Sequence, residues 1–487
     1  MWIVTGRLTP TGRIETTMKI KKGSMLDVDI TGIAFGGQGL ARVDGMAVFV
    51  DQAVPGDRVT IRIFKKKKNY AQARIVELHT ASPLRIVPPC EYSGFCGGCK
   101  WQFLNYDQQL VYKHQHVVES LEHIGGITGV KVHETLRSPA VFGYRNKMEF
   151  SCSDRRWLLP AEMSNPDIER GFALGLHVPG TYYKVIDTRA CLLQPEMGNQ
   201  LLQDVREFLG TSGRPVYGLH SHEGFWRFLM LRHSVARDQW MVNIVTSEAD
   251  RKTLDPLAEQ LMARYPQVVS VINNVTSRPA SVAIGESEYT LAGAGVIVDA
   301  IGGYEFEISA NSFFQTNTRG AAVLYKTVAD YAGLCGSETV LDLYSGTGTI
   351  PILLAGSCKE VIGIEIVDSA VADAVKNCQR NNVSNCRFIK GDLRTCLAHF
   401  APRPDVLIID PPRSGMHPDT VKQVLELEAE RIVYVSCNPA TLARDLTLMS
   451  DRYYPLEVQP VDMFPHTYHI ETVVKLGKNQ QESSSGS

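Results

Sequence analysis

Cys437 is the residue of this 487-residue chain whose setting most directly suggests chemistry. It stands in VSCNPATLARD (435–445), between an apolar, β-branched run typical of a buried strand and a run typical of a helix. Asn438 would cap that helix, and Pro439 suits its first turn because proline has no N–H to leave unpaired. A helix N-terminus favours the thiolate, so a lowered thiol pKa is expected. On this stretch alone Cys437 is either a nucleophile or a small buried hydrophobic residue.

A glycine-rich turn lies in ETVLDLYSGTGTIPILLAG (338–356), between a strand expected to end at Asp342 and a helix. Gly346 and Gly348 would let a ligand approach the backbone closely. The next strand, EVIGIE, ends in Glu365, whose carboxylate could accept hydrogen bonds from ribose hydroxyls. The third glycine of the dinucleotide fingerprint is absent. We therefore expect an adenosine-containing ligand without a pyrophosphate, most simply S-adenosylmethionine.

A third stretch, VLIIDPPRSG (406–415), places Asp410 directly after four apolar residues of a buried strand. In open α/β sheets ligands bind outside the carboxyl ends of the strands. Asp342, Glu365, Asp410 and Cys437 would all lie at that edge of the sheet. This convergence favours the interpretation of Cys437 as a nucleophile.

Three cysteines, Cys90, Cys96 and Cys99, fall within CEYSGFCGGC and indicate a metal or cluster site. A tetrahedral site needs a fourth ligand, for which Cys152 and Cys191 are the candidates. The spacing does not separate zinc from an iron–sulfur cluster.

The bulk composition is that of a globular protein, with 44% hydrophobic and 21% charged residues. The formal net charge of −2 argues against a uniformly basic nucleic-acid binder, but residues 58–74 hold seven Lys or Arg and no acid. No apolar run reaches membrane-spanning length, and the N-terminus lacks the apolar core of a signal peptide. We therefore expect a cytoplasmic protein without a membrane partner, whose thiols stay reduced.

The elements that position these residues predict an α/β protein of several domains. Residues 1–24 are predicted to be a disordered extension, 25–85 a small OB-type β-barrel whose basic residues could contact nucleic acid, and 86–310 an α+β central domain with the cysteine cluster. Strands and helices alternate over 311–478, which predicts a doubly wound, Rossmann-like parallel sheet. Residues 479–487 form a polar tail.

Taken together, these stretches resemble the RNA (uracil-5-)-methyltransferase family, in particular its ribosomal-RNA branch, over nearly all of residues 25–478. The resemblance rests on the barrel (a TRAM domain in that family), the Cys-x5-Cys-x2-Cys spacing, FFQTN (313–317), DLYSGTGTI, DPPRSG, VYVSCNPATLARD and DMFPHTYHIETVVKL. Many members carry a cysteine where Ser345 stands here, and the first two dozen residues match nothing in the family.

Residue by residue, the resemblance implies that Cys437 adds to uracil C6 and that Glu471 removes the C5 proton. It implies a class I methyltransferase domain. Its S-adenosylmethionine contacts would be the turn glycines Gly346 and Gly348 together with Gln315, Tyr344, Thr349, Glu365, Asp392 and Asp410. It also implies a 4Fe–4S cluster, with zinc as the alternative, on Cys90, Cys96, Cys99 and Cys191.

The chemistry requires such residues because uracil C5 is a weak carbon nucleophile until a thiolate adds at C6. The uracil must leave its stack, and Phe313, Phe314 and Phe464 could roof its pocket. The basic barrel and YRNK (144–147) would contact phosphates. The expected partner is RNA, ribosomal rather than transfer RNA, bound by a monomer.

Three alternatives remain open at this point. A transfer-RNA uracil-C5 methyltransferase would use the same residues. An RNA amino-methyltransferase would need Asp-Pro-Pro but no cysteine nucleophile. A non-catalytic RNA-binding protein would not need to keep Cys437, Glu471, Gln315 and Asp410 together.

Overall fold

The computed structural model describes residues 20–168, 170–279, 283, 285–398 and 400–479, and two short antiparallel strands, β1 (Arg7–Leu8) and β2 (Ile14–Glu15). Most of the predicted extension (1–24) and tail (479–487) lies outside the described residues. Among the described helices, none is both long and apolar enough to cross a membrane.

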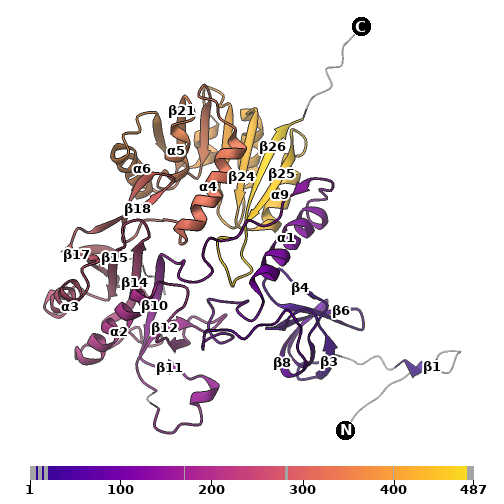
Figure 1. Cartoon of the computed structure of the whole chain (residues 1–487), viewed down its shortest axis with the longest axis vertical. Coiled ribbons are helices and arrows are strands. Elements are labelled where there is room, and N and C mark those ends of the chain that lie inside the picture. The colour runs from indigo at the N-terminus through magenta and orange to yellow at the C-terminus, as the bar shows by residue number, and fades with distance from the viewer. Residues whose placement is uncertain are drawn as a thin grey trace. The chain divides into compact units, whose positions relative to one another are not determined.

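The chain forms two compact units (Figure 1). The barrel unit comprises Met1–Gly94, Cys99–Tyr112 and His466–Tyr468, and the large unit comprises Phe95–Gly98, Lys113–Pro465 and His469–Ser487. The segments predicted as a central domain and as a parallel-sheet domain both lie mainly in the large unit, so the boundary at residue 310 stays a prediction.

The barrel unit is built on one six-stranded sheet, in the order β3-β7-β8-β6-β5-β4. These strands are β3 (Met25–Asp29), β4 (Gly32–Ile33), β5 (Gly39–Val43), β6 (Met46–Asp51), β7 (Arg58–Lys66) and β8 (Tyr70–Thr80). Alternate residues of β7 point inward, with Val59, Ile61 and Ile63 in the core. The run 65–68 is exposed, which leaves its lysines in solvent.

The large unit contains an eight-stranded mixed sheet in the order β11-β13-β12-β10-β14-β15-β16-β17. Its strands are β10 (Lys147–Ser153), β11 (Arg156–Trp157), β12 (Ala173–His177), β13 (Val185–Asp187), β14 (Trp226–Ser234), β15 (Gln239–Thr246), β16 (Val268–Val275) and β17 (Ser287–Gly293). The 3-10 helix η1 (Pro160–Glu162) and the helices α2 (Glu196–Thr211) and α3 (Arg251–Arg264) accompany it.

A second eight-stranded sheet has the order β22-β21-β20-β23-β24-β26-β25-β9. Its first five strands are parallel, and they are β20 (Thr339–Leu343), β21 (Glu360–Glu365), β22 (Cys386–Lys390), β23 (Val406–Ile409) and β24 (Arg431–Ser436). β26 (Glu471–Lys478) runs antiparallel between β24 and β25 (Tyr453–Val461), and β9 (Lys131–Val132) adds the edge. The predicted α/β fold class is confirmed.

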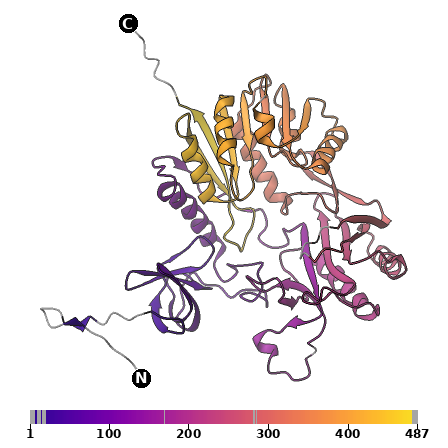
Figure 2. The same ribbon diagram turned by 180° about the vertical axis from the view of Figure 1, so that it is seen from behind.

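Helices cover both faces of this parallel sheet, as Figures 1 and 2 show. One face packs against α4 (Thr318–Ala332), α5 (Thr349–Ala355) and α6 (Asp368–Arg380). The other packs against α1 (Tyr106–His123), α7 (Leu393–Leu397), α8 (Pro418–Leu427) and α9 (Pro439–Met449). Because the strands are buried on both faces, they read as continuous apolar runs in the sequence.

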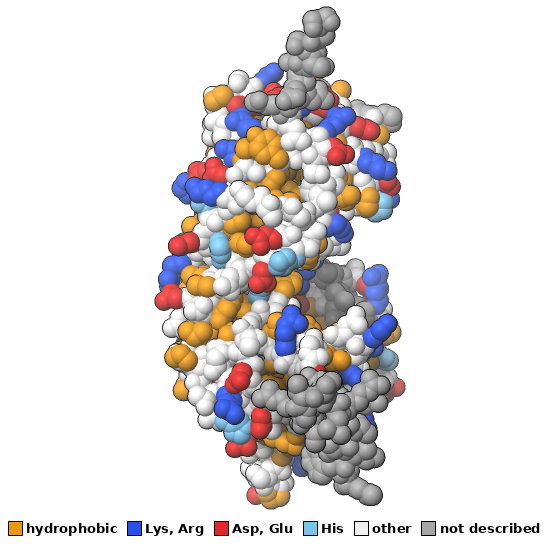
Figure 3. All heavy atoms as spheres, turned by 90° about the vertical axis from the view of Figure 1, so that its right-hand side faces the viewer, with side chains coloured by type: hydrophobic (Ala, Val, Ile, Leu, Met, Phe, Trp, Pro, Cys, Tyr) orange, Lys and Arg blue, Asp and Glu red, His pale blue; other side chains and the backbone are white. Residues whose placement is uncertain are grey.

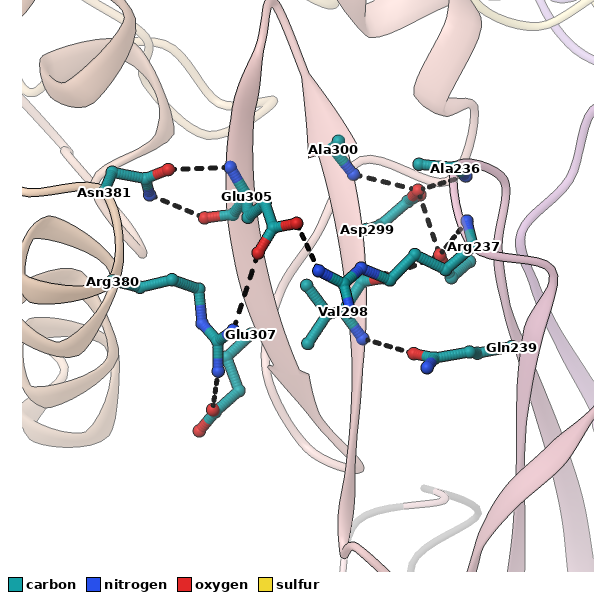
Figure 4. A network of polar contacts seen from close by, with 11 residues as sticks. Ala236, Arg237, Gln239, Val298, Asp299, Ala300, Glu305, Glu307, Arg380 and Asn381 are labelled. Carbon is teal, nitrogen blue, oxygen red and sulfur yellow. Dashed lines mark hydrogen bonds and ion pairs between the residues drawn. The ribbon is translucent and has the colours of Figure 1, made fainter.

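A hairpin of β18 (Val296–Ile301) and β19 (Tyr304–Ser309) ties the two large sheets together (Figure 4). Arg237, Glu305 and Arg380 form a chain of ion pairs across it. On α6, Asn377 accepts a hydrogen bond from Glu307 N (2.9 Å). The hairpin explains why both sheets fall within one compact unit.

Surface charges of both signs are interspersed on the face drawn in Figure 3, in keeping with the formal net charge of −2.

Candidate active site

The carboxyl edge of the parallel sheet carries the predicted chemistry. Asp342 lies in β20, Glu365 ends β21, Asp410 follows β23, and Cys437 lies between β24 and α9. As predicted, Asn438 caps α9: its side chain accepts a hydrogen bond from Ala440 N (3.1 Å).

The thiol of Cys437 is half-buried, and its pKa is raised to about 11. Burial is the largest cause, and the carboxylates of Glu471 and Asp410 act in the same direction. Arg413 opposes them through its charge and a hydrogen bond to the thiol. The expected lowering of this pKa is therefore wrong: the pKa is raised, mainly by burial.

Glu471, the first residue of β26, is buried beside the same groups. Burial and then Asp410 raise its pKa to about 8, and Arg413 opposes them. Burial raises the pKa of Asp410 to about 7. The structure thus brings Cys437, Glu471 and Asp410 together, and it places the Arg413 guanidinium near Cys437 and Glu471. The sequence did not indicate this role of Arg413.

Asp342 is a buried acid whose two carboxyl oxygens have no hydrogen-bond partner among the described residues. Burial, Asp410 and Glu365 raise its pKa well above the usual value. Tyr325 on α4, another residue that the sequence did not point to, lies near Asp410 and shares a hydrogen bond with the side chain of Gln315. A cluster of buried acids is a setting in which a cationic ligand would be stabilised.

A cavity of about 190 Å³ opens at the ends of β21 and β22. Tyr344, Glu365 and Asp392 line it, together with Ile364, Ile366, Gly391, Leu393, Arg394, His417 and Thr420. Asp392 caps α7 and pairs with Arg394, which holds the pKa of that carboxyl at about 2. Among the described residues, the lining does not include Gln315, Thr349 or Asp410.

The glycine turn is connected to the cavity by Glu365. Gly346 N donates to the Glu365 carboxylate (3.0 Å), and the N–H groups of Ile366 and Val367 also donate to it (2.8 Å each). Gly346 and Gly348 have φ values of 53° and 79°, which favour glycine. Thr349 begins α5 and is buried.

The three candidate roof aromatics have different surroundings. Phe313 is 68% exposed, whereas Phe314 lies in the core. Phe464 is partly buried, and its ring meets that of His469 edge to face, with the ring centroids 6.3 Å apart. Phe313 and Phe464 remain candidates for base contact.

The YRNK segment is wrongly predicted as a phosphate-binding motif at two of its positions. Tyr144 is buried and its hydroxyl donates to Pro465 O (3.1 Å). Asn146 is buried and its amide donates to Gln315 O and to Thr318 Oγ1 (2.8 Å each). Both side chains are therefore used inside the protein: Tyr144 holds the loop at Pro465, and Asn146 holds the segment of Gln315.

The four candidate cluster cysteines are divided between the units, with Cys90 and Cys99 in the barrel unit and Cys96 and Cys191 in the large unit. Among the described residues, no three His, Cys, Asp or Glu side chains form a group that could hold a metal ion. Four thiols suit a cluster chemically, so the cluster stays a prediction from the donor set.

Comparison with known proteins identifies the family of the chain. Residues 298–394 and 397–479 match the family model "tRNA (Uracil-5-)-methyltransferase", and residues 19–76 match the TRAM domain. An uncharacterized RNA methyltransferase of Chlorobaculum tepidum is 45% identical over 94% of this chain and 97% of that protein. Another, of Porphyromonas gingivalis, is 41% identical over 93% and 100%.

Among solved structures, that of Pyrococcus abyssi tRNA (uracil-54, C5)-methyltransferase in complex with S-adenosyl-L-homocysteine is similar, with a TM-score of 0.72 and 29% identity. The match covers 93% of this chain and 100% of that one. The chain therefore belongs to the RNA (uracil-5-)-methyltransferase family and is a methyltransferase that acts on RNA.

Proposed function

We propose that the protein forms 5-methyluridine in ribosomal RNA, with Cys437 as nucleophile and Glu471 as base. The observation that carries the proposal is the convergence of these two side chains with Asp410 and Arg413 at one edge of the sheet. A covalent addition needs a nucleophile, and the elimination that follows needs a base. A neighbouring guanidinium can stabilise the negative charge of the thiolate.

In the proposed reaction the Cys437 thiol loses its proton to water and its sulfur bonds to uracil C6, while the C5–C6 π electrons move to form the O4 enolate. The Arg413 guanidinium stabilises the thiolate before it adds. Carbon C5 then takes the methyl group. Glu471 in its ionised form removes the C5 proton, and the electron pair left at C5 reforms the C5–C6 bond and expels the thiolate.

S-adenosylmethionine supplies the methyl group when bound, and the residues of this chain fit it. Tyr344, Glu365 and Asp392 line the cavity at the carboxyl edge of the parallel sheet. The carboxyl of Asp342, which has no hydrogen-bond partner among the described residues, lies near Glu365. Buried acids favour the cationic sulfonium over the neutral product, S-adenosylhomocysteine, by electrostatics alone. Gln315 and Asp410 would contact its methionine end, and Thr349 and the turn glycines would support it.

Ribosomal RNA is the favoured substrate because the predicted cysteine cluster and TRAM barrel resemble that branch of the family. Transfer RNA is the second candidate, because the Pyrococcus abyssi neighbour is named a tRNA (uracil-54, C5)-methyltransferase. A 4Fe–4S cluster on Cys90, Cys96, Cys99 and Cys191 is part of the proposal. Iron and sulfide analysis of the purified protein tests it, because a zinc site would contain neither iron nor sulfide. A protein with zinc would also be colourless.

Trapping with RNA that contains 5-fluorouridine tests the function. Fluorine cannot leave as a proton does, so the Cys437–RNA adduct should survive denaturing electrophoresis once the methyl group is transferred. Fragments of ribosomal RNA and whole transfer RNA, each with S-adenosylmethionine, report the substrate class.

Two variants and a control sharpen the test. Cys437→Ala should abolish the adduct, whereas Glu471→Gln should keep it. Cys335→Ala is the matched control, because Cys335 is an exposed cysteine outside the site. Methylation of ordinary RNA with no adduct on fluorinated RNA would contradict the proposal and favour amine methylation.

A further inference from the structure

The first residues of the loop between β25 and β26 are held by side chains from remote parts of the large unit. Three successive carbonyl oxygens each accept one hydrogen bond: Met463 from Asn317 Nδ2 (2.9 Å), Phe464 from Lys113 Nζ (3.1 Å) and Pro465 from Tyr144 Oη (3.1 Å). Loop carbonyls usually face water. Here they are fixed one by one, so the path of residues 462–465 is tightly specified.

Lys113 contributes the only charge among these three donors. Its side chain and that of Asp462 are both 0% exposed, with Nζ 2.6 Å from Oδ1. The same Oδ1 accepts a hydrogen bond from Phe464 N (3.0 Å). Burying an ion pair has a desolvation cost that apolar side chains would avoid, so stability alone does not explain the pair.

This segment adjoins the proposed base in the sheet. Val461, the last residue of β25, pairs with Glu471, the first residue of β26, and Asp462 follows Val461 directly. The ring of Phe464 packs edge to face against His469, two residues before Glu471. A shift of residues 462–465 would therefore move both a candidate wall of the uracil pocket and the start of the strand that carries Glu471.

We propose that Lys113 is a positioning residue of the methylation reaction: by fixing residues 462–465 through Asp462 and Phe464 O, it holds Glu471 where the C5 proton of the Cys437 adduct is removed. The inference rests on the proposed function and adds to it a residue 324 positions before Cys437 in the sequence. Lys113 does not touch the reacting atoms; it acts through the loop.

The test uses full-length protein with Lys113→Met and Asp462→Asn combined. The double substitution removes the ion pair without stranding a buried charge, and the amide oxygen introduced at position 462 can still accept from Phe464 N. On ordinary uridine RNA, proton removal should become the slow step, because a misplaced base costs about 10- to 100-fold in rate. A methylated covalent protein–RNA adduct should then accumulate in single-turnover reactions, as in Glu471→Gln, while the Kd for S-adenosylmethionine stays within about twofold of the wild-type value.

A matched control separates positioning from a general loss of stability. Asp204 is buried, and it accepts from Tyr265 Oη (2.8 Å) at the end of α3, away from the site. Asp204→Asn with Tyr265→Phe removes that buried contact and should accumulate no adduct, whatever its melting temperature. Adduct in both double variants, or slower turnover of the Lys113 variant with no adduct, would overturn the inference.

Wild-type protein on fluorinated RNA distinguishes the two proposals. If wild type forms no adduct there, the proposed function fails and the role of Lys113 fails with it. If wild type forms the adduct but the Lys113 and Asp462 double variant releases methylated RNA at the wild-type rate, the positioning role alone is wrong.

Discussion

Replacing Arg413 with methionine is expected to make Cys437 a weaker nucleophile. Burial raises the thiol pKa to about 11, so at pH 8 about one thiol in a thousand is ionised. Arg413 is the cation that opposes this, through its charge and a hydrogen bond. Methionine keeps much of the side-chain volume and removes both effects.

The expected size follows from that one contact. A hydrogen bond to a charged group contributes about 1.5–3 kcal/mol, and about 1.4 kcal/mol corresponds to one pH unit. Arg413→Met should therefore raise the pKa of Cys437 by about one to two pH units further, and the thiolate fraction at a given pH should fall about 10- to 100-fold.

Alkylation by iodoacetamide, followed by mass spectrometry of the peptide that carries Cys437, measures the thiolate directly. Between about pH 7 and 10 the wild-type rate should rise about tenfold per pH unit, because the pKa lies above this window. Arg413→Met should give a parallel line at lower rates, and the fluorouridine adduct should form correspondingly more slowly.

Arg403→Met is the matched control, since this exposed arginine pairs with Glu428 and Glu430 and lies before β23, at the other end of the sheet. Its alkylation profile should equal that of wild type. Equal alkylation rates of Cys437 in Arg413→Met and wild type would refute the reasoning, because Arg413 would then not stabilise the thiolate.

Three further predictions concern acids and glycine. Glu471 and Asp410 stay protonated in the folded protein to about pH 8 and 7, but they ionise near pH 4.5 and 3.8 in the unfolded chain, so the folded state binds more protons between these values. Stability should therefore be lost as pH rises, and the melting temperature should fall from about pH 5 to 8. Glu471→Gln should make this fall smaller. Binding of S-adenosylmethionine near Asp410 should lower the pKa of Asp410 and release protons at about pH 7, which calorimetry in buffers of different ionisation enthalpy measures. S-adenosylhomocysteine lacks the sulfonium charge and should release fewer protons, so equal release by the two ligands would contradict this prediction. Gly348→Ala should weaken cofactor binding at least about tenfold, as measured by equilibrium dialysis, because φ at this position is 79° and the new Cβ would lie 2.9 Å from Ala374 Cβ and from Phe388 Cζ. Unchanged affinity would show that the turn can change shape to accept the side chain.

Much of the sheet edge was predictable because its signals are local. An apolar run followed by Asp410, or a glycine turn after Asp342, indicates a parallel strand and its end. Parallel strands bring their carboxyl ends to one edge, so residues far apart in sequence could be placed together. The Asn438 cap and Pro439 are equally local, and the structure confirms both.

The features that were missed depend on burial or on distant partners. Arg413 looks like a solvated turn residue until its neighbours are known, and the raised pKa of Cys437 comes from burial that no local pattern shows. Lys113 lies on an amphipathic helix, and its partner Asp462 is 349 residues away. YRNK is predicted from its sequence to contact phosphates, whereas the side chains of Tyr144 and Asn146 are buried and make hydrogen bonds inside the fold.

The position of β26 has a consequence for synthesis of the chain. This strand, the last among the described residues, lies between β24 and β25, and it begins with Glu471. Domains form from the N-terminus as the polypeptide leaves the ribosome, but this sheet stays split until its final strand inserts. A nascent chain that already has Cys437 but has not yet added β26 lacks its proposed base, so we expect any uracil that it methylates to stay bound to Cys437.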